Sequence, residues 1–188
     1  MVSDKKKYVR LSYNISNETT ANAAPYNTLA LKITPIERFG KGDTADTSLV
    51  ELFNHCGTHM DLPGHKIVGG KTLTDYSVEE FIFEQPYIID VELSDEQSLS
   101  IEQIEQYSDE LARCDILLLR SEFSGYRSTD LQRYVWRTPG VSVDAAEWLV
   151  NNFPNIKAVG MNFLSFEIID NSSHKSKGHV ALLSRDVK

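Results

Sequence analysis

A cluster of metal-ligand residues directly after a β-prone segment constrains this chain more than any other feature. Eleven residues hold three of the five histidines and one aspartate, namely His55, His59, His65 and Asp61. Imidazole nitrogens and carboxylate oxygens are typical ligands of zinc and manganese. The spacing His-x3-His-x-Asp predicts that His55, His59 and Asp61 bind a metal. His65 stands apart from this triplet as a candidate for acid–base chemistry.

The residues around the cluster predict a turn and exclude a zincin helix. A zincin needs Glu directly after its first histidine, whereas Cys56 follows His55 here. Gly57 weakens a helix, and Pro63 with Gly64 would end one. Residues 48–53, four of which are apolar, predict a strand. We therefore expect a loop-borne site at the end of a strand, supported by a rigid sheet.

The two cysteines, Cys56 and Cys114, are too few for a disulfide framework. Cys114 opens an apolar run and is expected to behave as a small buried residue. Cys56 adjoins His55, and neighbouring side chains on an extended chain point to opposite faces. Metal binding by the Cys56 thiolate is therefore the weaker of its two interpretations, and packing the stronger.

Composition is that of a globular protein with one domain, expected to span residues 1–188. The net charge of −8 argues against a nucleic-acid partner. An uninterrupted apolar run of about 18 residues is absent, so the sequence predicts no membrane partner. No apolar signal-peptide core is present near the N-terminus, and a reducing cytoplasm fits the cysteine content.

Local patterns predict alternating strands and helices. Ser100 and Gln103 have capping-box spacing ahead of a helix over residues 101–111, and Ser142 has the position of an N-cap for a helix over 143–152. Strands are expected at residues 8–13, 28–34, 86–93, 114–119 and 156–161, with a turn at 39–47 and a short helix at 78–83. This alternation favours a single α/β domain with right-handed crossovers.

The cluster also resembles a known signature. Residues 54–65 are similar to the His-x-Gly-Thr-His-x-Asp-x-Pro-x-His signature of the cyclase family of metal-dependent hydrolases, which includes bacterial kynurenine formamidases and isatin hydrolases. Residues 138–149 resemble the family's Pro-Gly-led helix. Residues 159–162 resemble the strand that follows, although Asn162 stands where relatives often have Asp. Residues 178–183 resemble its His-x-x-Leu-Leu segment.

The resemblance implies roles for individual residues. His55, His59 and Asp61 would bind one divalent ion, zinc or manganese, and Asp61 would also reach a second ion held by His179. His65 would be the general acid/base. The implied fold is a mixed, barrel-like curled β-sheet flanked by helices, and the implied assembly is a homodimer or homotetramer. From its residue type alone, His179 has the alternative role of capping a helix.

The implied activity is hydrolysis of an amide, formamide or lactam-like C–N bond in a small-molecule substrate by metal-activated water. Tyr26, in the loop where formamidases carry a substrate-contacting tryptophan, and His174 are the candidate substrate-binding residues. The polar neighbours of His174 favour the alternative of a solvated loop histidine. Only nine residues follow His179, so a metal-binding glutamate that relatives carry about a dozen residues later is absent. We expect either a truncated chain or a lost ligand. The alternative function is a catalytically silent binding or scaffold protein on the same fold.

Overall fold

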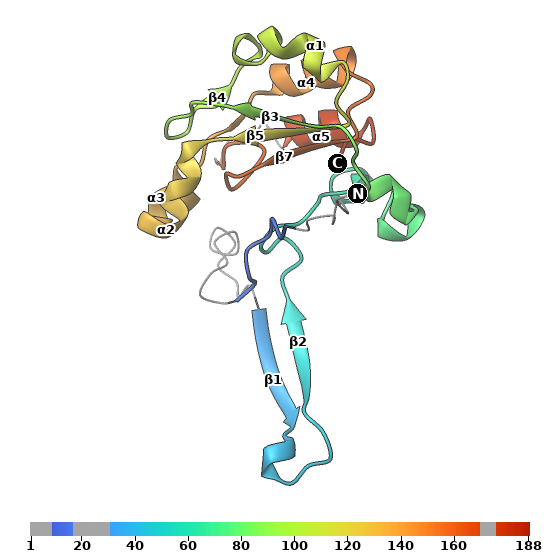
Figure 1. Ribbon diagram of the computed structural model, residues 1–188, viewed down its shortest axis with the longest axis vertical. Coiled ribbons are helices and arrows are strands. Elements are labelled where there is room, and N and C mark those ends of the chain that lie inside the picture. The colour runs from blue at the N-terminus through green and yellow to red at the C-terminus, as the bar shows by residue number, and fades with distance from the viewer. Residues whose placement is uncertain (1–8, 17–30, 170–175) are drawn as a thin grey trace, which may run out of the picture. The chain divides into compact units, whose positions relative to one another are not determined.

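A computed structural model describes residues 9–16, 31–169 and 176–188 (Figure 1). The two predicted substrate-binding residues, Tyr26 and His174, lie outside these ranges. The chain divides into two compact units, Met1–His59 and Met60–Lys188, which are described separately. The expectation of a single domain over 1–188 stays a prediction.

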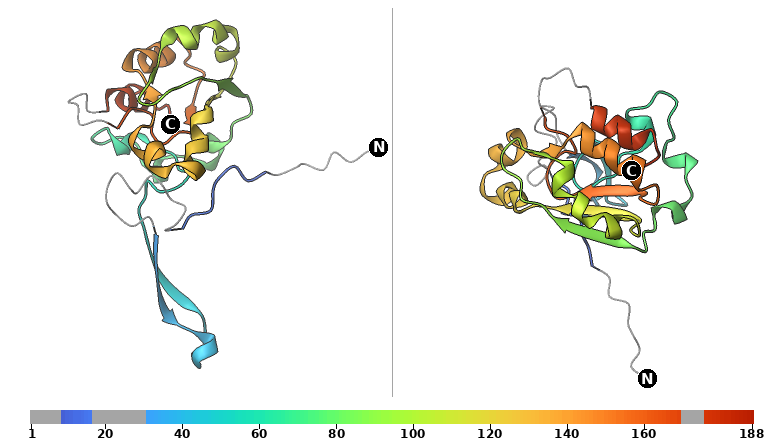
Figure 2. Two further views of the ribbon diagram at one scale, coloured as in Figure 1. Left: turned by 90° about the vertical axis from the view of Figure 1, so that its left-hand side faces the viewer. Right: turned by 90° about the horizontal axis from the view of Figure 1, so that it is seen from above.

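The first unit is dominated by an antiparallel hairpin of β1 (Leu31–Glu37) and β2 (Thr47–Leu52). Figures 1 and 2 show it as an extended two-stranded ribbon. The connection contains the 3-10 turn η2 (Phe39–Lys41) and Gly42, whose φ of 100° lies in the region that glycine adopts readily. The structure confirms the predicted turn at 39–47 and the strand at 48–53.

The hairpin register is regular except near Pro35. Lys32 lies opposite Glu51, and the lysine Nζ is 2.7 Å from the carboxylate Oε2. The register shifts between Pro35 and Glu37, where proline has no N–H to donate to the ladder. The sequence predicts a strand over 28–34. Within the described part of the chain it begins at Leu31, and it ends at Glu37, three residues beyond the predicted end. The strand expected at 8–13 is wrong for residues 9–13, which pair with no other strand.

A three-stranded parallel sheet forms the core of the second unit. Its strands are β3 (Pro86–Asp90), β5 (Ile116–Arg120) and β7 (Ala158–Met161), in the order β3-β5-β7. β5 is the central strand, and its Leu117 and Leu119 are almost fully buried. All three strands fall in segments predicted as strands, and β5 reads as an apolar run because a central parallel strand is covered on both faces.

Two further short strands, β4 (Ser98–Leu99) and β6 (Gly140–Val141), form a separate parallel pair. The described residues thus contain three small sheets and no closed barrel. The expectation of one mixed, barrel-like sheet is corrected to a mixed α/β arrangement. β4 and β6 pair over only two residues each, which is too short to carry a continuous ladder around a barrel.

The longest helix among the described residues, α4 (Val143–Asn152), confirms the sequence prediction at both ends. The Ser142 hydroxyl accepts a hydrogen bond from the Ala145 N–H at 3.1 Å. Ala145, Ala146 and Leu149 bury one face of the helix. Figure 1 shows α4 on the same side of the β3-β5-β7 sheet as α1. The other described α-helices are α1 (Ser108–Leu111), α2 (Tyr126–Thr129), α3 (Leu131–Trp136) and α5 (Lys177–Leu183).

The helix expected over 101–111 is broken into three short pieces. They are η6 (Ile101–Gln103), η7 (Glu105–Tyr107) and α1. The capping box is present, with the Ser100 N–H donating to the Gln103 side chain at 3.1 Å. Ile104 interrupts the helix at φ −120°, and its side chain is fully buried. Tertiary packing has therefore overridden local helix propensity.

The remaining helical turns are η3 (Pro63–His65), η4 (Leu73–Asp75), η5 (Val78–Phe81) and η8 (Glu122–Gly125). The short helix predicted over 78–83 is η5. Within the described ranges, no helix combines the length and the apolar character that crossing a membrane requires.

Candidate metal centre

The predicted ligands lie on a turn that leaves β2, as expected. Residues 53–62 belong to neither helix nor strand. Gly57 allows the turn with a φ of 68°, and a Cβ at this position would lie 3.1 Å from Cγ1 of Ile15. A larger residue would be strained in this conformation, so the glycine has a structural reason here.

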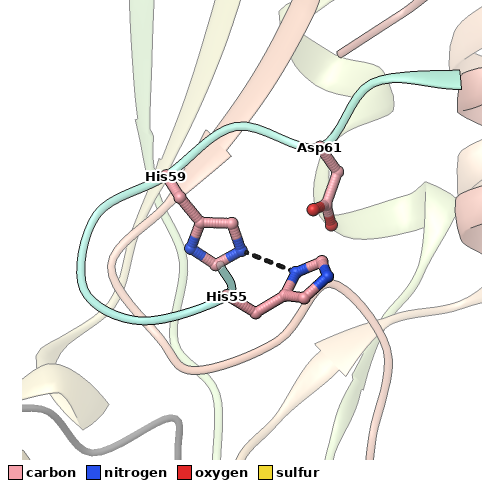
Figure 3. A group of neighbouring side chains, drawn as sticks. All are labelled: His55, His59 and Asp61. Atoms are coloured by element: carbon pink, nitrogen blue, oxygen red, sulfur yellow. Dashed lines mark hydrogen bonds between the residues drawn. The ribbon is translucent and has the colours of Figure 1, made fainter. Parts of the chain in front are cut away.

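His55, His59 and Asp61 converge at this turn (Figure 3). One ligand atom from each residue lies within 4.8 Å of the others. Nδ1 of His55 is 3.2 Å from Nε2 of His59. Two nitrogens that share a tetrahedral zinc ion at bond lengths of about 2.0–2.1 Å would be about 3.3 Å apart. The two imidazoles are therefore spaced as ligands of one ion would be.

The orientation of His59 is fixed by its second ring nitrogen. Nδ1 of His59 lies 3.0 Å from the carbonyl oxygen of Gly57. A carbonyl only accepts, so Nδ1 carries the proton and Nε2 has the lone pair that faces His55. Metal-binding histidines are usually oriented by such a contact. The donor set and its orientation fit a divalent ion, and the role of these residues as ligands stays a prediction.

Cys56 does not join this group. Its side chain is 4% exposed and packs with Phe53, and among the described residues the metal-capable group contains His55, His59 and Asp61. Cys114 is also buried with a free thiol, as predicted, and burial raises its pKa. The structure thus favours packing as the role of both cysteines.

Asp61 also faces His65. Asp61 precedes η3 and His65 is its last residue, and Oδ2 of Asp61 lies 3.9 Å from Nε2 of His65. The carboxylate is therefore within reach of both the ligand group and the predicted acid/base. The ring of His65 lies 6.3 Å, centroid to centroid, from that of His179.

His179 lies in the first turn of α5 and is held by Glu167. Nδ1 of His179 is 2.5 Å from Oε2 of Glu167. The same carboxylate accepts hydrogen bonds from the backbone N–H of Gly178 at 2.9 Å and of His179 at 3.1 Å. Burial opposes ionisation of Glu167, but these hydrogen bonds from His179 and the backbone lower its pKa overall. An ionised carboxylate is therefore expected here.

Sequence reasoning missed Glu167. It lies twelve residues before His179, with 170–175 between them, and no short-range pattern connects the two. The glutamate that the resemblance implies in relatives follows the histidine, whereas Glu167 precedes it. Glu167 therefore contacts His179 and orients its ring. It is not a further ligand in the group of His55, His59 and Asp61.

The second unit also contains an open cavity of about 390 Å³ that involves no predicted site residue. In its wall, the Arg133 guanidinium is 2.8 Å from Asp95 and stacks 3.9 Å from the centre of the Tyr126 ring. Arg133 and Asp95 form an ion pair with each other, which indicates a structural role for these two residues in the wall. The cavity is lined by Leu93, Ser94, Asp95, Glu122, Phe123, Gly125, Tyr126, Thr129 and Arg133.

Comparison with known proteins decides the family. Residues 9–168 match the model of the Cyclase family, whose description is "Putative cyclase". The chain belongs to this family. The match covers the ligand turn, the parallel sheet and Glu167, so the cyclase resemblance read from the signature is confirmed.

Individual relatives of this Cyclase member are distant in sequence. An uncharacterised protein of Haemophilus influenzae is 27% identical over 132 residues, which cover 70% of this chain and 87% of that protein. The structure of a potential metal-dependent hydrolase with cyclase activity matches with a TM-score of 0.59 at 21% identity, covering 84% of this chain and 68% of the other.

Two more solved structures share the fold. An isatin hydrolase bound to the product analogue thioisatinate has a TM-score of 0.61 at 18% identity, with 87% of this chain and 70% of that chain covered. A predicted metal-dependent hydrolase from Bacillus stearothermophilus has a TM-score of 0.62 at 20% identity, with 94% and 77% covered. At these identities the likeness establishes the fold.

Proposed function

We propose that this Cyclase-family protein is a metal-dependent hydrolase that cleaves a C–N bond of a small molecule. The convergence of His55, His59 and Asp61 within 4.8 Å carries the proposal. Two oriented imidazoles and a carboxylate on a loop supply three protein ligands. Catalytic zinc sites commonly have three such ligands and keep a further position for water or substrate.

The chemistry expected of the site follows from these ligands. A divalent ion bound there supplies Lewis acidity, which makes water nucleophilic near neutral pH and polarises a carbonyl oxygen. His55 and His59 bind through the two nitrogens that face each other, and Asp61 contributes negative charge that favours a cation. Zinc and manganese both accept this donor set, so the proposal includes either metal.

His65 is proposed as the general acid/base of the reaction. Its imidazole is held near Asp61 and is not one of the three clustered ligands. Imidazole titrates near neutral pH and can deliver a proton to a departing amine nitrogen. Without this proton the amine leaves as an unstable anion, so His65 acts where the C–N bond breaks.

The proposed substrates are amides, formamides and lactams. Each of these substrates has a carbonyl group that a metal ion can polarise. An isatin hydrolase, whose name indicates action on isatin, has a related fold. We propose His179 as a ligand of a second ion, which gives one or two metals per chain. Tyr26 and His174 remain proposed substrate contacts.

The test combines metal loading with a substrate panel. The purified protein would be dialysed against chelator, reloaded with Zn²⁺ or Mn²⁺, and assayed against aryl formamides, cyclic imides, lactams and, as a non-nitrogen control, lactones. We expect hydrolysis of a C–N substrate that disappears on chelation and returns on reloading. A folded protein that takes up no metal would refute the proposal and support the silent binding or scaffold alternative. Metal uptake with lactone cleavage alone would refute the choice of bond.

We also propose a homodimer or homotetramer in the cytoplasm. Apolar side chains on the hairpin strands support self-association, because Ile33, Ile36, Leu49 and Val50 are each more than half exposed. A two-stranded hairpin is marginally stable in water without further packing. Light scattering coupled to size exclusion would measure the mass, and a monomer at micromolar concentration would refute the assembly.

A further inference from the structure

We propose that Glu167 is the positioning residue of His179. Its carboxylate holds the Nδ1–H of the imidazole and thereby presents Nε2, with its lone pair, for binding a divalent ion. The inference rests on the proposed function, because it takes His179 as a metal ligand. It goes further by assigning a role to a residue that lies outside the ligand signature.

The hydrogen bonds at Glu167 determine which nitrogen of His179 carries the proton. Oε1 accepts from the N–H of Gly178, and Oε2 accepts from the N–H of His179. Backbone N–H groups only donate, so both carboxylate oxygens act as acceptors. An ionised carboxylate has no proton to donate, so Nδ1 of His179, at 2.5 Å from Oε2, is the donor. In the neutral ring, the lone pair is then on Nε2.

The backbone of Glu167 is anchored from one side by β6. The Val141 N–H donates to the carbonyl of Phe166 at 2.6 Å. A Cβ on Gly140 would lie 2.7 Å from the carbonyl carbon of Glu167 and 2.5 Å from the nitrogen of Ile168. The segment is thus pressed against β6, and a glycine there permits the approach. The backbone from which the Glu167 side chain extends is therefore fixed in position.

The side chain of Glu167 is confined from the other side by α5. A Cβ on Gly178 would lie 3.1 Å from Cδ of Glu167, so the carboxylate packs directly on the glycine. The ring of Phe166 meets the ring of His179 edge to face, with centroids 5.5 Å apart and an interplanar angle of 75°. Glu167 fixes one edge of the imidazole and Phe166 fixes its plane.

The same geometry argues that Glu167 is a support and not itself a ligand. Both oxygens already accept backbone hydrogen bonds, and Oε2 also accepts the Nδ1 proton. An ion bound to these oxygens would lie against three hydrogen-bond donors. Carboxylates that hold the second nitrogen of a metal-binding histidine are common, and losing one typically weakens metal binding roughly 10- to 100-fold.

The decisive variant is Glu167→Gln. The glutamine oxygen can still accept from the backbone of α5, but its NH₂ group then faces Nδ1 of His179. Nδ1 becomes an acceptor and the proton moves to Nε2, where it blocks metal binding. Glu167→Asp retains the charge on a shorter side chain and should restore part of the wild-type behaviour. Glu80→Gln is the matched control, because Glu80 also accepts a backbone N–H at the start of a helical turn, that of Ser77 at 2.9 Å.

The readout is ¹⁵N NMR of the imidazoles in the intact chain, without metal and at a pH where imidazole is neutral. His179→Gln assigns the His179 signals. We expect a protonated Nδ1 in the wild type and in Glu80→Gln, and a protonated Nε2 in Glu167→Gln. Zn²⁺ titration should shift the Nε2 signal of wild-type His179, with affinity roughly 10- to 100-fold weaker in Glu167→Gln.

Three outcomes would overturn the inference. The first is a wild-type His179 protonated at Nε2, which needs no variant and so holds even if Glu167→Gln fails to fold. The second is an Nε2 chemical shift of wild-type His179 that does not change at saturating Zn²⁺. The third is equal zinc affinity in Glu167→Gln and wild type. A wild-type protein that meets the expectations but hydrolyses nothing would refute the proposed function and leave this inference standing.

Discussion

Nδ1 of His55 and Nε2 of His59 face each other across 3.2 Å, on a turn that begins at the end of β2. The contact joins residues four apart in a segment with no regular secondary structure. Because the Gly57 carbonyl fixes the His59 ring, the pair is oriented before any ion binds. Removing either histidine is therefore expected to lower the affinity of the site for a metal ion.

His59→Ala is expected to abolish metal retention without unfolding the protein. The His59 side chain is exposed, so its removal leaves no cavity in a core. Metal content after exhaustive dialysis, by elemental mass spectrometry, would be compared with circular dichroism of the same sample. Lys66→Ala, a nearby exposed change, is the control. Undiminished metal in folded His59→Ala would show that the ligand assignment is wrong.

His65→Ala is expected to leave the metal of His55, His59 and Asp61 bound and to slow turnover by about 10²- to 10⁴-fold. The reason is that His65 lies beside Asp61 without being part of the ligand group. Steady-state kinetics on the best substrate of the panel would measure the effect, with metal content as the internal control. Wild-type turnover in this variant would remove His65 from the mechanism.

Gly178→Ala is expected to weaken zinc binding at His179 while leaving the melting temperature unchanged or slightly higher. Alanine favours a helix by about 1 kcal/mol over glycine. The new Cβ, however, would lie 3.1 Å from Cδ of Glu167 and 3.2 Å from Cε1 of Phe166, and would push the carboxylate away from Nδ1 of His179. Zinc titration and thermal unfolding would separate the two effects. Lower stability with unchanged zinc affinity would contradict this prediction.

Asp186→Asn is expected to lower the free energy of unfolding at neutral pH, because it removes the charge that pairs with Lys71. The loss should be about 1 kcal/mol, since Asp186 is only partly buried. Burial works against the charged form, but hydrogen bonds from Lys71 and Tyr76 lower the pKa of Asp186 below its usual 3.8. The ionised carboxylate therefore stabilises the fold above about pH 4, and this stabilisation is lost as pH falls through the lowered pKa.

The measurement for Asp186 is the free energy of unfolding in urea at neutral and strongly acidic pH. Wild type and Asp186→Asn should differ at neutral pH and converge in acid. Asn tolerates positive φ as Asp does, so the φ of 59° at this position does not confound the comparison. A constant difference across pH would show that the carboxylate charge is not the cause.

Short-range patterns in the sequence predicted several elements, and α4 with both of its boundaries. α4 begins after Ser142 because a hydroxyl caps its first turn, and it ends ahead of Pro154, which cannot continue a helix. β5 was recognised because a strand covered on both faces reads as an unbroken apolar run. The interruption at Ile104 was missed, because burial of that side chain and not local propensity decided its backbone.

The sequence by itself determined the family and the candidate ligand turn, because His55, His59 and Asp61 meet through spacing within a few residues. Only the tertiary structure decided that Glu167 holds His179 and that Tyr76 donates to Asp186, across 12 and 110 positions. It also decided that the strands of the described residues form three small sheets in place of one curled sheet. Local patterns record which residues turn, cap or alternate. Contacts between distant residues depend on how whole elements pack, and no local pattern specifies that.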